Sequence, residues 1–123
     1  MKIIIAGSRS FNNYDFLKSK CDDIIKFRTD VEIVSGRCRG VDLLGEKYAF
    51  DRGYPVRPFP AKWRRLNGNI NYSAGFIRNE QMAKYANGLI AFWDMKSPGT
   101  KSMINLANKY NLKVRIIDIS VVN

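Results

Sequence analysis

Five stretches of the chain are apolar enough to form strands, and most of them are continuous runs rather than alternating patterns. Residues 2–6 read Lys-Ile-Ile-Ile-Ala, a β-branched run that is typical of a strand buried on both faces of a sheet. The predicted strands are residues 2–6, 31–34, 54–60, 88–93 and 113–119. The third contains three prolines, which confine it to an edge of the sheet or to an irregular segment.

Between these strands, apolar side chains recur at helical spacing. The predicted helices run from the asparagines at 12 and 13 to about Arg28, and over residues 41–52, 73–85 and 100–110. The side chains expected to face the core are Leu17, Cys21, Ile24 and Ile25 in the first helix, and Phe76, Met82, Ala83 and Ala86 in the third. On this face Cys21 is interpreted as a core side chain rather than a reactive thiol.

The alternation of strands and helices predicts the fold class. It favours an α/β, Rossmann-like three-layer sandwich with a mainly parallel five-stranded sheet and helices on both faces. The chain has 123 residues, 46% of them apolar, and no internal linker or repeat. We therefore expect a single domain over residues 1–123.

Composition narrows the chemistry. Lysine and arginine number 21 against 11 acidic residues, so the formal charge is +10, which favours anionic partners such as nucleotides or nucleic acid. There is no histidine, which excludes Ser-His-Asp and Cys-His catalysis, and two cysteines are too few for a structural zinc site. No metal is expected. With no targeting or membrane segment apparent, a reducing, cytoplasmic setting and no membrane partner are expected.

Three of the predicted strands end in small or polar turns: Gly7-Ser8-Arg9, Ser35-Gly36, and the turn that leads to Ser97, Gly99 and Thr100. The carboxyl ends of parallel strands share one edge of a sheet, where ligands bind at the point of strand-order reversal. Residues that are distant in sequence should therefore converge there.

The stretch from Ser35 to Asp42 has the strand, glycine turn and helix order that aims backbone N–H groups at an anion. Arg37 adds positive charge, and Gly40 opens the helix. Neither the dinucleotide fingerprint Gly-x-Gly-x-x-Gly nor the P-loop pattern is present, so hydride transfer and ATP hydrolysis lack their usual motifs. We interpret the loop as a binding site for a phosphate-bearing ligand.

Other side chains are candidates for the same site. Asp42 either complements the helix dipole or binds a ribose hydroxyl or a base edge. Arg78, next to Asn79, suits bidentate phosphate recognition, although a solvated position is the alternative. Trp63 and Trp93 are candidates for stacking on a base, and Trp93, at a strand end, is the better one; core packing is the alternative. The basic segment 61–72 is predicted to be a surface loop near the ligand end.

These motifs together resemble the SLOG superfamily of Rossmann-like proteins, in its YspA-like branch. The resemblance rests on Ile-Ala-Gly-Ser-Arg at 5–9, Ser-Gly-Arg-Cys-Arg-Gly-Val-Asp at 35–42, Pro-Val-Arg-Pro-Phe-Pro at 55–60, Ala-Gly-Phe-Ile-Arg-Asn-Glu-Gln-Met at 74–82, and Leu-Ile-Ala-Phe-Trp-Asp with Ser-Pro-Gly-Thr within 89–100. The superfamily includes lonely-guy phosphoribohydrolases, lysine-decarboxylase-like proteins and the DNA-processing protein DprA. The resemblance implies binding of nucleotides or nucleotide-derived molecules.

The enzymes of the superfamily can be compared with this chain position by position. Their catalytic Arg-x-x-x-Met segment is matched by Arg78 to Met82. Their catalytic glutamate is absent, and Met103 stands near its place. A general acid/base step needs a titratable group within reach, so the resemblance argues against catalysis of the usual kind. The chain also has Arg37 and Cys38 where relatives carry small residues, and Asn87 where aspartate is frequent.

We therefore expect a module that binds or senses a nucleotide or nucleotide-derived ligand, of the NAD or ADP-ribose kind, at the carboxyl edge of the sheet and without catalysis or a required cofactor. The predicted ligand-binding residues are Gly7, Ser8, Arg9, Ser35, Gly36, Arg37, Gly40, Asp42, Arg78, Asn79, Trp93, Ser97, Gly99 and Thr100. One alternative is a hydrolase of an N-glycosidic or phosphate bond, with Asp42, Glu46, Arg78 or Asp94 as candidate catalytic residues. Another is DNA or RNA binding. A homodimer, with Phe76 and Tyr85 at the contact, is expected by analogy only.

Overall fold

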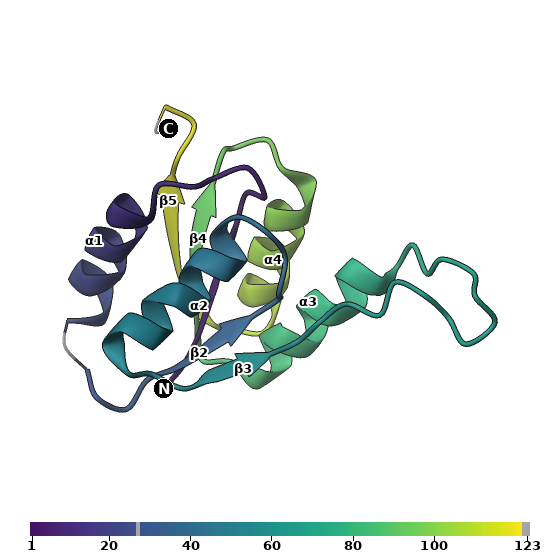
Figure 1. Cartoon of the computed structure of the whole chain (residues 1–123), viewed down its shortest axis with the longest axis horizontal. Helices are drawn as coiled ribbons and strands as arrows, with labels where there is room; N and C mark the ends of the chain where they lie inside the picture. The colour runs from purple at the N-terminus through teal and green to yellow at the C-terminus, as the bar shows by residue number, and fades with distance from the viewer. Residues whose placement is uncertain (27, 122–123) are drawn as a thin grey trace.

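A computed structural model describes residues 1–26 and 28–121 and confirms the predicted fold class (Figure 1). Over these residues all sheet pairings are parallel and the strand order is β3-β2-β1-β4-β5. The strands are β1 (Lys2–Gly7), β2 (Glu32–Ser35), β3 (Val56–Pro58), β4 (Gly88–Trp93) and β5 (Lys113–Asp118). The order reverses between β1 and β4, which lie side by side with Ile5 opposite Ile90.

Helices cover both faces of the sheet. They are α1 (Tyr14–Ile25), α2 (Val41–Arg52), α3 (Ala74–Tyr85) and α4 (Pro98–Lys109). Ile3 and Ile5 of β1 point into a core with α1 and α2, whereas Ile4 and Ala6 point into a second core with α3 and α4. The continuous apolar run at the start of the chain is explained by this alternation, since each face of β1 needs its own buried side chains.

Two predicted details differ from the structure. Helix α1 ends at Ile25, because Lys26 adopts a left-handed conformation and donates its N–H to Asp22 O; the predicted continuation to about Arg28 crosses residue 27, which lies outside the described residues. Phe76 was expected to face inward but is 54% exposed. The buried face of α3 instead includes Arg78 and Asn79, so apolar spacing does not mark it.

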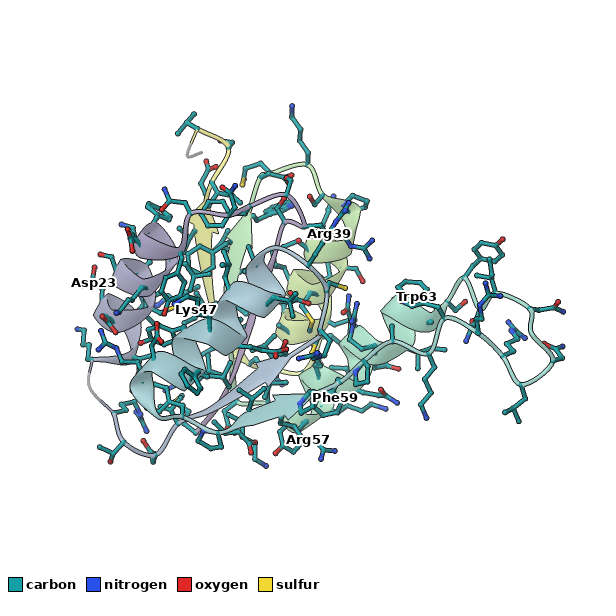
Figure 2. All side chains as sticks on the ribbon, in the orientation of Figure 1. Asp23, Arg39, Lys47, Arg57, Phe59 and Trp63 are labelled. Atoms are coloured by element: carbon teal, nitrogen blue, oxygen red, sulfur yellow. The ribbon has the colours of Figure 1, made fainter. Side chains whose placement is uncertain are left out.

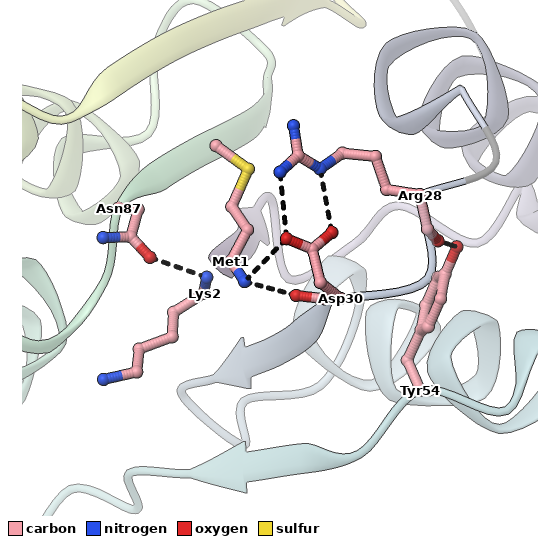
Figure 3. A network of polar contacts seen from close by, with 6 residues as sticks. All are labelled: Met1, Lys2, Arg28, Asp30, Tyr54 and Asn87. Carbon is pink, nitrogen blue, oxygen red and sulfur yellow. Dashed lines mark hydrogen bonds and ion pairs between the residues drawn. The ribbon is translucent and has the colours of Figure 1, made fainter.

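At the amino ends of the strands, polar contacts join segments that are far apart in sequence (Figure 3). The backbone N–H of Lys2 donates to Asn87 Oδ1 at 2.8 Å. Arg28 makes two hydrogen bonds to Asp30, and the Tyr54 hydroxyl donates to Arg28 O. Asn87 therefore serves the packing of β1 beside β4, at the edge opposite the predicted ligand site.

Residues 61–72, called the arm below, project away from the body of the molecule between β3 and α3 (Figure 1). As predicted, this segment is a loop; it folds back on itself through an isolated antiparallel bridge between Arg64 and Ile70, with a turn at Gly68, whose φ is 86°. None of the helices within residues 1–26 and 28–121 is long and apolar enough to cross a membrane.

Candidate ligand site at the carboxyl edge of the sheet

A cavity of about 360 Å³ lies where the chain leaves β1 and β4 at their carboxyl ends. This is the position where the strand order reverses and where open α/β sheets bind ligands. The cavity is lined by Ala6, Gly7, Ser8, Arg9, Cys38, Asp42, Arg78, Asn79, Met82, Ser97, Pro98, Gly99, Thr100 and Met103. Segments from four separate parts of the sequence therefore meet in one hollow, as the strand-end argument predicts.

Arg78 is the most constrained side chain of this cavity. It is 7% exposed, and its guanidinium donates to Gly36 O, to Asn79 Oδ1 at 2.9 Å and to Cys38 Sγ at 3.7 Å. It forms no ion pair with any carboxylate in the described part of the chain. These contacts use three of the five N–H donors of an arginine and leave two for a ligand. Asp42 interacts with this guanidinium electrostatically without forming an ion pair, so the guanidinium can still pair directly with a bound anion.

The first turn of α4 forms another wall of the cavity. Asp94 accepts the backbone N–H groups of Ser97 and Lys96, and these bonds, with a third from the Ser97 hydroxyl, lower the pKa of its carboxyl. Ser97 makes no capping hydrogen bond with its own side chain. The N–H groups of Gly99 and Thr100 belong to the first turn, which has no intrahelical acceptors, so they are available to an anion.

Gly99 has no side chain, which leaves the backbone of the first turn of α4 accessible. A Cβ atom built at this position meets no protein atom within 4 Å. Packing therefore does not require glycine here, unlike at Gly40, where φ is +81° and a Cβ would stand 2.3 Å from Ser8 O. The absence of a side chain at Gly99 lets a ligand approach the backbone closely.

Asp42 brings a carboxylate into this basic site. It is 6% exposed, and its Oδ2 accepts the backbone N–H of Cys38 at 3.1 Å. Burial raises the pKa of Asp42 to about 6, while the Cys38 N–H and the nearby Arg78 oppose the rise. At neutral pH it is mainly ionised, and its cavity-facing oxygen can accept a hydrogen bond from a hydroxyl or amino group.

The structure brings nine of the fourteen predicted ligand residues to the cavity wall: Gly7, Ser8, Arg9, Asp42, Arg78, Asn79, Ser97, Gly99 and Thr100. The other five, Ser35, Gly36, Arg37, Gly40 and Trp93, lie outside it. Two of these five, Gly36 and Gly40, support residues that line the cavity. Gly36 holds Arg78 through its carbonyl, and Gly40 lets the N–H of Val41 reach Ser8 O.

The remaining predicted residues have identifiable partners elsewhere. The buried Ser35 hydroxyl donates to Glu46 at 2.7 Å, and Arg37 forms an ion pair with the same Glu46. Glu46 therefore supports the loop and does not line the cavity. Trp93 packs against the second core and donates its Nε1–H to Ser97 O at 3.1 Å.

Several residues of the cavity were not among the predicted ligand residues. Cys38 and Met103 line it, and Met103 is the residue that the resemblance to the superfamily's enzymes puts near the position of their catalytic glutamate. Ala6, Met82 and Pro98 complete the lining. Apolar side chains on an α/β core carry no sequence signal that separates a cavity wall from ordinary packing. No cluster of three or more potential metal ligands occurs among the described residues.

Fold and site together define a Rossmann-like α/β protein with a cavity at its topological switch point. The sequence matches the family described as YspA, cpYpsA-related SLOG over residues 1–66, more than half of its length. The chain belongs to this family. No curated protein matches the sequence significantly.

Solved structures show the same fold in longer proteins. DNA processing protein A (DprA) from Streptococcus pneumoniae superposes with a TM-score of 0.77 at 18% identity, over 99% of this chain and 52% of DprA. DprA from Helicobacter pylori, described for its single-stranded DNA binding mode, superposes with a TM-score of 0.68 at 17% identity, over 94% of this chain and 64% of that one. This chain thus spans about half to two thirds of their length.

Proposed function

We propose that this protein binds a nucleotide or nucleotide-derived ligand in the cavity at the carboxyl edge of the sheet and does not alter it chemically. The observation that carries the proposal is the buried Arg78 guanidinium, which lines the cavity and forms no ion pair with a carboxylate of the described residues. The first turn of α4 lies on the same cavity and adds a helix dipole that favours negative charge.

In this proposal, each part of such a ligand has a partner among the cavity residues. A phosphate sits against the N–H groups of Gly99 and Thr100 and the free donors of Arg78. Asp42, which also lines the cavity, accepts a hydrogen bond from a ribose hydroxyl or from a base amino group. The ligand class is therefore an anion that also carries a hydrogen-bond donor separate from its phosphate, as the sugar hydroxyls and base amino groups of a nucleotide are.

Hydrolysis is the alternative, and one observation favours it. Asp42 has a pKa of about 6, which suits a general acid or base near neutral pH. Against this, Met103 contributes a thioether where a second titratable group is needed. Incubation of nucleoside monophosphates or NAD at high protein concentration, followed by chromatography, tests it: product that is lost in Asp42→Asn would overturn the proposal of binding alone.

A nucleotide and its nucleoside, which differ only in the phosphate, provide a direct test of binding that requires no change to the protein. In calorimetric titrations we expect a nucleoside 5′-monophosphate to bind and its nucleoside to bind at least about tenfold more weakly, since charge-assisted phosphate contacts are the stronger ones. The panel comprises AMP, GMP, CMP, UMP, ADP-ribose and NAD. Equal affinity for nucleoside and nucleotide, or no binding across the panel, would contradict the proposal.

Single-stranded nucleic acid is the second candidate ligand, supported by the net charge of +10 and by the described activity of the DprA neighbour. Specific binding should give a gel shift that survives moderate salt, whereas attraction by charge alone is lost steeply as salt is added.

A further inference from the structure

A second hollow, of about 230 Å³, adjoins the ligand cavity. It is lined by Arg9, Arg37, Cys38, Arg39 and Trp63, and is called the arginine hollow below. Arg9 and Cys38 line both spaces, so the hollow continues the cavity outward. Figure 2 shows Arg39 on the loop that leads into α2, and Trp63 at the base of the arm beside the first turn of α3.

The arginine hollow carries positive charge that the described residues do not neutralise. Arg37 is paired with Glu46, but Arg9 and Arg39 form no ion pair with a carboxylate in residues 1–26 and 28–121. The arm next to the hollow adds Lys62, Arg64 and Arg65 and contains no acidic residue. An anionic group is therefore the complementary occupant.

Trp63 offers a flat, partly exposed surface within this charge. The indole is 42% exposed, and a Cβ on Gly75 would lie 3.2 Å from its edge, so the ring rests on the start of α3. The backbone of the arm also holds it, because Asn71 N donates to Trp63 O. An aromatic ring held among arginines is a stacking platform for a nucleobase.

We infer that the arginine hollow is a second subsite, which takes a further nucleotide unit joined through phosphate to the one in the cavity. Arg9 and Arg39 contact the linking phosphate, and the second base stacks on Trp63. This inference rests on the proposed function, because it extends the ligand from the same cavity. A second copy of this chain is a poor occupant, since two chains of charge +10 would bring basic surfaces together.

The linked unit has two sources, a pyrophosphate-linked dinucleotide and a single strand of nucleic acid. Calorimetry with AMP, NAD, the dinucleotide pApA and a twelve-residue oligo-dA separates them. We expect at least one linked ligand to bind about tenfold or more tightly than AMP. Tighter binding than AMP by NAD alone indicates a site for a pyrophosphate-linked dinucleotide. Affinity that increases from pApA to oligo-dA indicates a site for a single strand. Both results support the second subsite.

Substitutions in the arginine hollow test whether the gain in affinity for linked ligands arises there. Trp63→Ala and Arg39→Ala should each remove most of it and leave the affinity for AMP unchanged, while Trp63→Phe should restore part of it. Phe50→Ala, on an 85% exposed aromatic of α2, and Arg115→Ala, on the exposed edge strand β5, are the matched controls and should change nothing.

Equal affinity for AMP and every linked ligand would overturn the inference and leave the proposed function standing. So would a gain that survives both Trp63→Ala and Arg39→Ala. Failure of AMP to bind, with linked ligands still dependent on Trp63, would instead contradict the cavity as a nucleotide site and retain the arginine hollow as the binding surface.

Discussion

At the scale of single residues, the site combines groups that are unfavourable for folding. Arg78 is a buried cation that forms no ion pair with the nearby Asp42, and Asp42 is a carboxyl whose pKa is raised by burial. Well-packed apolar side chains at such positions would often give an equally or more stable protein. Their presence together in one cavity supports the proposed ligand site, and their residue types alone made them candidates in the sequence. Their burial follows from the packing of α2 and α3 in the folded protein and could not be predicted from the sequence.

Replacing Asp42 by asparagine should stabilise the fold in a pH-dependent way. The pKa rises from an ordinary value of 3.8 to about 6 on folding, so between these pH values the folded protein holds a proton that the unfolded chain has lost. Stability contributed by this group therefore falls as the pH rises through the window, by about 3 kcal/mol at most.

The prediction is checked by urea unfolding at two pH values. Asp42→Asn should raise the free energy of unfolding at pH 7.5 by up to about 3 kcal/mol and change it little at pH 4, where both side chains are uncharged. The same loss of stability at both pH values would contradict the burial of an ionisable group at this position.

At the scale of elements, burial on both faces made the central strands β1, β2 and β4 easy to predict, whereas β3 and β5 lie at the exposed edges of the sheet. The predictions were wrong or incomplete for segments whose buried positions are not apolar. Helix α3 packs mainly against α4 and turns Arg78 and Asn79 inward, so Phe76 is left outside. The sequence favoured Trp93 for stacking on a base because it lies at a strand end, whereas only the folded arm shows that Trp63 lines the same hollow as Arg39. No local sequence pattern predicts where the arm lies relative to the loops of the sheet.

The turn into α2 should be far less tolerant of a side chain than the turn out of it. Gly40 and Gly53 both have φ near +80°, at 81° and 74°, but only at Gly40 does a Cβ meet another atom, Ser8 O at 2.3 Å. Gly40→Ala should therefore cost more than about 1 kcal/mol of stability, and more than the matched Gly53→Ala. Equal losses in chemical denaturation would show that the contact between the β1 and β2 loops is not as tight as described.

At the scale of the whole molecule, part of the positive charge lies next to the candidate site. Several cations without ionic partners among the described residues lie along one route, from the cavity past Arg9 and Arg39 to the arm. The net charge predicted an anionic partner from composition alone. Composition could not assign that charge to a site, because basic residues are also common on surfaces that bind nothing.

If a nucleic acid strand follows this route, its affinity should fall linearly with salt on a logarithmic plot. For single strands the slope is roughly −0.7 for each phosphate contact, so Arg39→Ala should make it shallower by about 0.7. Arg115→Ala, which removes the same charge from β5, should leave the slope unchanged. The comparison requires fluorescence anisotropy with a labelled oligonucleotide over a salt series; identical slopes for both variants would assign the binding to overall charge.

The central claim is that a nucleotide-type ligand sits against the first turn of α4. Its most direct test is calorimetric titration of the wild-type protein and of Gly99→Ala with AMP and ADP-ribose. A methyl group at Gly99 meets no protein atom, so the fold should be at least as stable. The methyl would occupy the space through which a phosphate reaches the backbone, so affinity should fall by about tenfold or more, which is 1.4 kcal/mol. Binding by Gly99→Ala as tight as that of the wild type, or none by either protein, would contradict the account.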